Sequence, residues 1–332
     1  MPEPGVWGLI LAGGDGSRLR ALTTKPCGTA VPKQFCSLHG GHSLLEEAIL
    51  RGGRIVASER LCTIVADQHR QWWSECRLLA ALPRENLIVQ PRNRGTGVGV
   101  LYSLLHIIGR APEARLVLLP SDHYVREEDV LRRSIIEALD RVERAPERPV
   151  LLGLTPDEAD TELGYVLPEE VDPLGGYTVA RFIEKPDLDV ARRIVEAGAM
   201  WNTFILVGTA RALLELYLPR YASLVRDLQV LLELGGSTGS PTATWPALVN
   251  LYGQLPDLDF SRDLLQGHEA ALCVLKVPSC GWSDLGTPRR VGQTLRRLRA
   301  FEPIKPTPAP SAHINLAVQH AHFERAHLGA TV

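Results

Sequence analysis

Short runs of apolar residues alternate along the first half of the chain with segments whose apolar residues recur at helical spacing. Such runs are typical of buried parallel strands, and they fall at residues 6–12, 61–66, 86–90, 116–120 and 150–154. The helical segments fall at residues 43–51, 68–80, 97–108 and 127–143. Because right-handed crossovers turn a βαβ series into a parallel sheet with helices on both faces, the pattern predicts an α/β fold whose ligands lie at the carboxyl ends of the strands.

The pattern changes after residue 160. Residues 164–184 alternate apolar and polar positions as a hairpin does, with Gly175 and Gly176 at the turn. We interpret this stretch as a subregion inserted into the same domain. Later segments predict strands at 201–208 and 271–277, helical residues at 210–234 with a break at Pro219, and a helix at 289–299. The expected result is a mixed, mostly parallel sheet flanked by helices.

The end of the chain has a different composition. Residues 303–310 read PIKPTPAP, and prolines at this density prevent regular hydrogen bonding. We therefore expect one domain over residues 1–300, followed by a proline-rich linker and C-terminal tail over residues 301–332.

Charge and hydropathy exclude several kinds of partner. The chain has 36 basic and 38 acidic residues, whereas nonspecific nucleic-acid binding normally needs a basic excess. The sequence offers neither the roughly 18 uninterrupted apolar residues of a membrane span nor a basic N-terminal region followed by a long apolar stretch. We expect no nucleic-acid or membrane partner, and a cytoplasmic location.

The six cysteines do not form a zinc-binding pattern. No Cys-x-x-Cys pair or matching histidine spacing occurs among Cys27, Cys36, Cys62, Cys76, Cys273 and Cys280. Reduced thiols are the favoured interpretation, with a structural disulfide as the alternative.

The strongest chemical signal is a glycine-rich run after the first predicted strand. Residues 11–19 read LAGGDGSRL, and residues 32–35 read PKQF. Such glycines let backbone N–H groups approach phosphate oxygens, and Arg18 and Lys33 supply the positive charge that a triphosphate needs. A P-loop would need Gly-Lys-Ser/Thr at the start of a helix, and a dinucleotide fingerprint would need a glycine where Leu19 stands. We therefore expect a phosphate-binding loop of another kind.

These segments belong to a set of ordered motifs that spans nearly the whole chain. The others are PSDH at 120–123, FIEKP at 182–186, WN at 201–202 and WSDLG at 282–286. On these motifs the sequence resembles the sugar-phosphate nucleotidyltransferases, and within them the mannose-1-phosphate guanylyltransferases. The resemblance implies a Rossmann-like nucleotidyltransferase fold in which the inserted subregion binds the sugar.

Two aspartates are the expected ligands of a magnesium ion. Asp122 follows the strand predicted at 116–120, so its carboxylate should project from the strand's carboxyl end, and hard divalent cations prefer oxygen ligands. The resemblance implies that Asp284 completes the same Mg²⁺ site from the other side. His123 has no metal-ligand spacing and is expected to pack beside the site.

The resemblance assigns the sugar phosphate to Lys185 and the sugar hydroxyls to Glu184 and Asn202. A lysine is a compact charge for a phosphate, whereas a carboxylate suits hydroxyl donors. Gly164 and Tyr165 resemble the stretch whose backbone N–H contacts the sugar.

Nucleotide recognition is expected from the first glycine loop and from the loop after strand 86–90. The residues are Leu11, Ala12, Gly13, Gly14, Asp15, Gly16, Ser17, Gln90, Gly95 and Thr96. The second loop departs from the guanylyltransferase pattern, because residues 94–99 read RGTGVG where that pattern commonly reads RNTAPA. An amide side chain and a proline are therefore missing.

We predict an enzyme with Arg18, Lys33, Asp122 and Lys185 as catalytic residues. A sugar 1-phosphate is already an anionic nucleophile at neutral pH, so it can attack a nucleoside triphosphate directly. The expected substrates are GTP, or another nucleoside triphosphate, and mannose 1-phosphate, giving GDP-mannose and pyrophosphate. Two alternatives stay open: a transferase for another pair, such as UTP with glucose or N-acetylglucosamine 1-phosphate, and a non-catalytic subunit that senses nucleotide sugars. Assembly as a homodimer also stays open.

Overall fold

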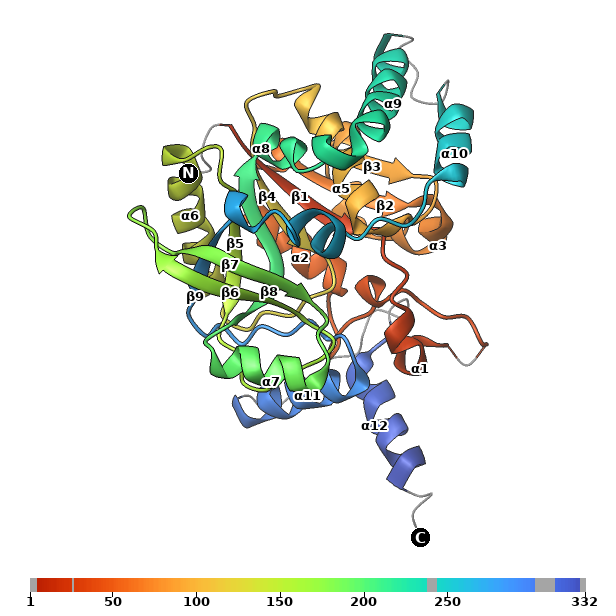
Figure 1. Ribbon diagram of the computed structural model, residues 1–332. Helices are drawn as coiled ribbons and strands as arrows, with labels where there is room; N and C mark the ends of the chain where they lie inside the picture. Colours follow the sequence, from red (N-terminus) through yellow and green to blue (C-terminus); the bar gives the residue numbers. More distant parts are fainter. Residues whose placement is uncertain (1–4, 26, 238–243, 302–313, 329–332) are drawn as a thin grey trace.

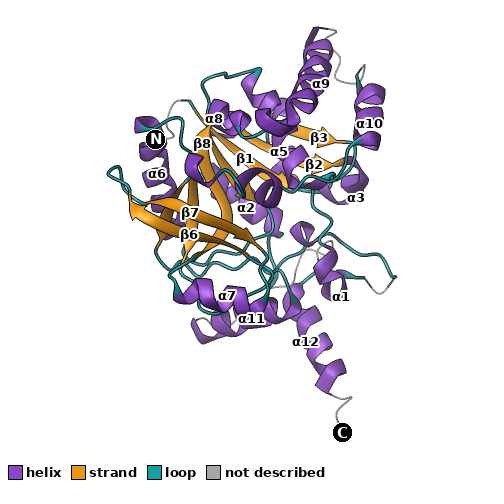
Figure 2. Ribbon diagram, viewed as in Figure 1, coloured by secondary structure: helices purple, strands orange, loops and turns teal. Residues whose placement is uncertain are grey.

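The apolar runs of the sequence form the strands of one sheet (Figures 1 and 2). The computed structural model describes residues 5–25, 27–237, 244–301 and 314–328. The strands are β1 Val6–Ala12, β2 Leu61–Ala66, β3 Leu87–Gln90, β4 Arg115–Pro120, β5 Val150–Leu154, β6 Gly164–Val171, β7 Tyr177–Glu184, β8 Met200–Thr209 and β9 Cys273–Val277. The helices are α1 Arg20–Thr23, α2 Leu44–Gly53, α3 Arg70–Trp73, α4 Arg77–Ala80, α5 Gly95–Ile108, α6 Glu128–Arg144, α7 Leu188–Glu196, α8 Ala210–Glu215, α9 Leu218–Ser237, α10 Trp245–Gln254, α11 Pro288–Phe301 and α12 Leu316–Leu328.

The sheet is mixed, as predicted. Over the described residues its strand order is β3-β2-β1-β4-β8-β5-β9-β7-β6. β1 pairs in parallel with β2 and β4, and β2 with β3. β8 runs antiparallel to β4 and β5, and β7 runs antiparallel to β9 and β6. The parallel strands β1 to β4 therefore end at one edge, so the loops that follow them face the same crevice.

Helices cover both faces of the sheet, and each face has its own apolar core. Alternate residues of β1 point to opposite faces, so Ile10 belongs to the core with α2 and α6, whereas Leu9 belongs to the core with α5 and α8. In Figure 1, α9 and α10 stand at one end of the molecule and α12 at the other. Within the described ranges, no helix has both the length and the apolar character that crossing a bilayer requires.

The predicted helix at 68–80 is two helices. α3 ends at Trp73 and α4 begins at Arg77. The indole N–H of Trp73 donates to the main-chain oxygen of Ala66 (2.9 Å), which holds α3 against the end of β2. This tertiary contact overrides the continuous helical spacing.

The helical stretch 210–234 is interrupted on both sides of Pro219, because α8 ends before it and the backbone of Tyr221 inside α9 leaves the helical region (φ −125°, ψ 24°). α8 ends at Glu215 and α9 begins at Leu218, so Pro219 occupies the first turn of α9. A proline is tolerated there because the first helical N–H groups have no partner within the helix.

The helix α12 packs against α1 and α11, beyond the predicted domain boundary at residue 300. The main-chain N–H of Ser37 donates to Ile314, and the N–H of Leu316 donates to the carbonyl of Ser37, both at 2.8 Å. Leu316 is fully buried. The proline-rich stretch 303–310 lies outside the described residues, and the division at residue 300 stays a prediction.

The six cysteines, all described, are free thiols, as the sequence favoured. Burial raises the pKa of Cys36 to about 12 and that of Cys62 to about 11. Cys27 is exposed in the turn between α1 and the PKQF segment. A hydrogen bond with the hydroxyl of Thr29 lowers the pKa of the Cys27 thiol.

A buried ion pair fastens the turn of the β6–β7 hairpin to α6. Arg141 Nη2 lies 2.7 Å from Asp172 Oδ2, and the side chains of Arg141 and Asp172 are 2% and 6% exposed. Arg141 also donates to the main-chain oxygen of Gly175 (2.6 Å). The hydrogen bond from Arg141 lowers the pKa of Asp172 to about 2.

Replacing Asp172 with asparagine should lower the free energy of unfolding by about 3 kcal/mol, because Arg141 would stay buried without its counter-ion. Because the folded pKa of Asp172 lies below its ordinary value of 3.8, this contribution is present above about pH 4 and is lost as the pH falls through about 2. Urea titration followed by circular dichroism measures the loss. The matched control is Asp189→Asn, since Asp189 pairs with Arg192 on the surface, where such pairs contribute at most about 1 kcal/mol. Equal losses in the two variants would contradict the prediction.

Candidate active site

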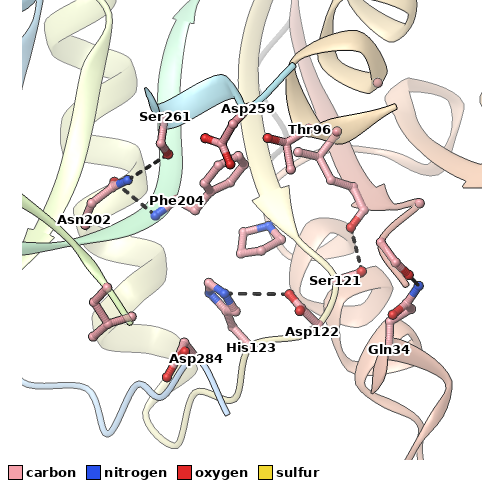
Figure 3. A pocket seen from close by; sticks show the side chains of 18 of the residues that line it. Gln34, Thr96, Ser121, Asp122, His123, Asn202, Phe204, Asp259, Ser261 and Asp284 are labelled. Carbon is pink, nitrogen blue, oxygen red and sulfur yellow. Dashed lines mark hydrogen bonds and ion pairs between the residues drawn. The ribbon is translucent and has the colours of Figure 1, made fainter. Parts of the chain in front are cut away.

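A cavity of about 340 Å³ lies at the carboxyl ends of β1, β3 and β4, next to the start of β6 and the end of β7. The predicted site residues that line it are Leu11, Gly13, Gly14, Arg18, Gln90, Gly95, Thr96, Asp122, Gly164, Glu184, Lys185, Asn202 and Asp284. Segments far apart in the sequence thus meet in one cavity (Figure 3).

Other predicted residues do not line this cavity. Ala12 and Tyr165 are fully buried, and the Tyr165 hydroxyl donates to the main-chain oxygen of Asp160 (2.9 Å). The Asp15 carboxylate turns toward His69, whose Nε2 lies 3.1 Å away. Ser17 begins a 3-10 helix that ends at Leu19. The side chain of Tyr165 therefore shapes the site from within the core, and ligand contacts by Asp15 and Ser17 stay predictions.

Gln34 and Gly16 set the position of the glycine loop. The Gln34 amide donates to the carbonyls of Ala12 (3.1 Å) and Gly14 (2.7 Å). Gly16 has a φ of 61°, and a Cβ on it would lie 2.7 Å from the main-chain nitrogen of Lys33. The glycine loop and the PKQF segment thus pack directly on each other, which explains why the two motifs occur together.

Lys33 lies beneath the cavity. Its side chain is 6% exposed, and its ammonium group lies 2.9 Å from Asp122 Oδ2. The same group donates to the main-chain oxygen of Asp284 (2.6 Å). One lysine thus joins the two segments that carry the candidate metal ligands, and direct contact of Lys33 with a triphosphate stays a prediction.

Asp122 is charged and its neighbour His123 is neutral at pH 7. Burial alone would raise the pKa of Asp122, but the nearby charge of Lys33 and weaker charges around it outweigh burial and lower that pKa. Burial lowers the pKa of His123 to about 4. The His123 ring packs edge-on against Trp282, with ring centroids 5.2 Å apart, and its Nε2 lies 3.7 Å from Asp122 Oδ1 (Figure 3).

Asp122 and Asp284 form a donor set that fits Mg²⁺. Asp284 is 5% exposed, and its Oδ1 has no hydrogen-bond partner. A buried carboxylate oxygen that lacks a donor is stabilised by a cation. The described residues contain no group of three or more His, Cys, Asp or Glu side chains that could hold a metal. Two carboxylates still suit Mg²⁺, which commonly keeps waters and takes phosphate oxygens as further ligands.

An ion pair connects the glycine loop to the segment before β6. Arg18 Nη1 lies 2.9 Å from Glu162 Oε2, and both residues line the cavity. Both side chains are nearly half exposed, so this pair contributes little to stability. Arg18 can therefore exchange this carboxylate for a phosphate at low cost.

The end of the cavity formed by β7 and β8 offers groups that suit sugar hydroxyls. Lys185 Nζ lies 2.6 Å from Glu184 Oε1, and burial raises the pKa of Glu184 although Lys185 opposes the shift. The Asn202 amide donates to Ser261 Oγ (3.5 Å) and accepts from the N–H of Phe204 (3.1 Å) (Figure 3). Carboxylate, amide and hydroxyl groups at one end can bind several hydroxyls of a ligand.

The opposite end of the cavity contains Gln90 and residues of the loop 94–99, which departs from the guanylyltransferase pattern. Gln90 is 2% exposed, and its Oε1 accepts from the Tyr252 hydroxyl (3.4 Å). Gly95 has a φ of 79°, and a Cβ on it would overlap the main-chain oxygen of Leu258. That oxygen accepts from the N–H of Gly97 (2.7 Å). The segment at Leu258 thus occupies the space that an asparagine at position 95 would need.

Strained backbone gathers at the cavity. Over the described residues, the non-glycine residues with positive φ are Lys185 (47°), Phe204 (59°) and Leu285 (48°). Lys185 and Phe204 line the cavity, and Leu285 follows Asp284. Each such conformation costs on the order of 1–3 kcal/mol, and such strain clusters at ligand sites. The strain thus marks the cavity independently of the motifs.

Sequence reasoning missed several residues that line the cavity. These are Gln34, Ser121, Glu162, Phe204, Asp259, Ser261 and Trp282. Gln34, Ser121 and Trp282 belong to motifs that the sequence analysis quoted, so they could have been found. Asp259 and Ser261 lie in a stretch without a signature, and their place depends on the hydrogen bond from the Phe260 N–H to the Thr96 hydroxyl (2.9 Å).

The fold is of the Rossmann-like α/β class, with its cavity where such sheets bind ligands. A sequence model of the family described as "Nucleotidyl transferase" matches residues 7–297. The chain belongs to this family of nucleotidyltransferases, as its motifs predicted. The matched region includes every segment that lines the cavity.

Curated relatives support the same resemblance, and a solved structure supports the fold. The mannose-1-phosphate guanylyltransferase of Salmonella muenchen is 30% identical, over 84% of this chain and 57% of its own length. The enzyme of that name from Escherichia coli K12 is 29% identical, over 86% of this chain and 59% of its own length. The chain thus spans a little over half the length of these relatives. A Thermus thermophilus structure, described as a mannose-1-phosphate geranyltransferase, matches with a TM-score of 0.70 and 24% identity over 88% of this chain and 79% of that one, which confirms the fold.

Proposed function

We propose that the chain transfers the guanylyl group of GTP to mannose 1-phosphate, giving GDP-mannose and pyrophosphate. The observation that carries this proposal is the meeting of Arg18, Asp122, Lys185 and Asp284 in one cavity. A glycine loop suited to phosphates lies on one side of these charges and hydroxyl-binding groups lie on the other. The choice of guanine and mannose rests on the curated relatives.

The reaction is a direct displacement at the α-phosphorus of GTP. An oxygen of the sugar phosphate forms the new bond, and the bond to the bridging oxygen of pyrophosphate breaks. The sugar phosphate is already an anion, so no side chain has to remove a proton. Lys185 holds this phosphate, and Glu184 and Asn202 hold the sugar hydroxyls. Arg18 leaves Glu162 to stabilise the charge that develops on pyrophosphate.

Asp122 and Asp284 would hold Mg²⁺. When bound, this cation withdraws charge from the α-phosphate. Lys33 keeps Asp122 ionised and holds the backbone of Asp284, so that the two carboxylates stay fixed relative to each other. Neutral His123 packs beside them without adding a competing charge.

Gln90 favours a base that presents a carbonyl group. Its Oε1 is engaged by Tyr252, which leaves the side-chain NH₂ to donate into the cavity. Guanine O6 accepts such a bond, whereas the amino group of adenine does not. Uracil O4 also accepts, so UTP with glucose or N-acetylglucosamine 1-phosphate is the competing pair.

A pyrophosphate-release assay tests the function. It crosses GTP, UTP, ATP and dTTP with the 1-phosphates of mannose, glucose and N-acetylglucosamine, with and without Mg²⁺. We expect the fastest release from GTP with mannose 1-phosphate, and none after chelation of the metal. Faster release from a UTP pair would replace the proposed substrates. Ligand-dependent stabilisation against heat without any pyrophosphate release would identify a sensor instead.

A further inference from the structure

Arg290 is a buried cation that no motif contains. It lies in the first turn of α11 and is 5% exposed. Its Nε lies 3.1 Å from Asp160 Oδ2 and 3.5 Å from Asp284 Oδ1. The guanidinium carbon lies 4.4 Å from the centroid of the Trp201 ring. A single side chain thus contacts three segments of the site, namely two loops and the start of β8.

Each of these contacts leads to a different part of the cavity. Asp284 is the candidate metal ligand, and Trp201 precedes Asn202 at the sugar end. The carboxylate of Asp160 accepts from the N–H of Glu162 (2.8 Å), the residue that pairs with Arg18. A shift of α11 would therefore displace residues at the metal, sugar and phosphate parts of the cavity together.

The hydrogen bonds of this cluster are incomplete. Arg290 Nε and Nη2 and Asp284 Oδ1 have no partner that meets hydrogen-bond geometry. Arg290 Nε lies 3.5 Å from Asp284 Oδ1, so it attracts this carboxylate without making a well-formed hydrogen bond to it. The positive charge of Arg290 is also shared with Asp160. Arg290 thus restrains the Asp284 carboxylate on its Oδ1 side, which leaves Oδ2 as the oxygen that could bind a cation.

We propose that Arg290 is a positioning residue that orients Asp284 for binding of the divalent cation. The proposal rests on the magnesium site of the proposed function. An arginine suits this role because its planar group can lie on the Trp201 ring while its edge faces two carboxylates. A lysine would keep the charge but could not make these contacts together.

The variant Arg290→Lys therefore keeps the positive charge but removes the contacts that orient Asp284. Residues that orient metal ligands typically change metal affinity by 10–100-fold when mutated. We expect Arg290→Lys to weaken binding of Mn²⁺ to the substrate-free protein about tenfold or more, measured by the electron paramagnetic resonance signal of free Mn²⁺. The Mg²⁺ concentration that gives half-maximal pyrophosphate release should rise in parallel.

The neighbouring variant Arg289→Lys is the matched control. Arg289 is exposed on the same helix and pairs with Glu158 (2.8 Å), so it should leave Mn²⁺ affinity unchanged. Thermal unfolding of both variants reports the purely structural effect. Equal Mn²⁺ affinity in wild type and Arg290→Lys would overturn the proposal, even if the variant melts at a lower temperature.

The outcome is distinguishable from failure of the proposed function. A protein that binds Mn²⁺, loses affinity in Arg290→Lys and releases no pyrophosphate from any substrate pair would support the role of Arg290 and refute the transferase. A wild-type protein that does not bind Mn²⁺ would overturn the role of Arg290 together with the metal site.

Discussion

Replacing Asp122 with asparagine should slow pyrophosphate release by a factor of about 100 or more. The substitution keeps the shape of the side chain but removes one of two carboxylates that would hold the cation, and loss of one charge-stabilising group commonly costs 10²–10³ in rate. It also leaves the buried ammonium group of Lys33 without its counter-ion at 2.9 Å. The measurement is the initial rate at saturating GTP, mannose 1-phosphate and Mg²⁺.

The matched control for this variant is Asp67→Asn. Asp67 follows β2 as Asp122 follows β4, but it pairs with Arg70 at the surface, outside the cavity. Circular dichroism should show folded protein for both variants. A rate near that of wild type in Asp122→Asn would contradict its assignment as a metal ligand.

Replacing Gly16 with alanine should lower kcat/KM for GTP roughly a hundredfold, since displacement of reacting groups by about 1 Å can cost this much. The new methyl group would lie 2.7 Å from the main-chain nitrogen of Lys33, so either the glycine loop or the PKQF segment has to move. The positive φ of 61° adds strain on the order of 1–3 kcal/mol. Steady-state kinetics with GTP as the varied substrate measure the effect.

The control variant Gly28→Ala separates the effect of backbone strain from the effect of a steric clash. Gly28 has a similar torsion, with φ of 85°, but a Cβ there would meet no atom within 4 Å. Because of the backbone strain, Gly28→Ala should have a lower melting temperature than the wild type. Its kcat/KM for GTP should be unchanged. An equal kinetic defect in both variants would show that close packing at Gly16 is not what positions the loop.

The apolar runs predicted β1 to β5 to within about one residue because a buried strand needs an uninterrupted apolar stretch. They could not predict direction. The run in β8 is buried on both faces, as a parallel strand would be, yet β8 runs antiparallel to its neighbours. The local sequence pattern also did not predict the helix α12. This helix packs on α1 and α11, and hydrogen bonds with Ser37 fix the residues at its start.

The motifs led to Arg18, Asp122 and Lys185 because phosphates and cations require charged groups in fixed segments. The motifs did not show in which direction a charged side chain points. Nothing in the motifs indicated that Lys33, the expected ligand of the triphosphate, also pairs with Asp122. Arg290 had no signal at all, because its partners Asp160 and Trp201 come near it only in the folded chain.

The distribution of thiols allows the turn between the glycine loop and the PKQF segment to be labelled with a dye in the native sequence. Cys27 is exposed and its thiol ionises more readily than usual, while the other five cysteines are buried. Maleimide dyes react with accessible thiolates, so a fluorophore would attach selectively at this turn. Because the turn connects the glycine loop to the PKQF segment, the emission of the dye would report the arrival of a nucleotide in real time.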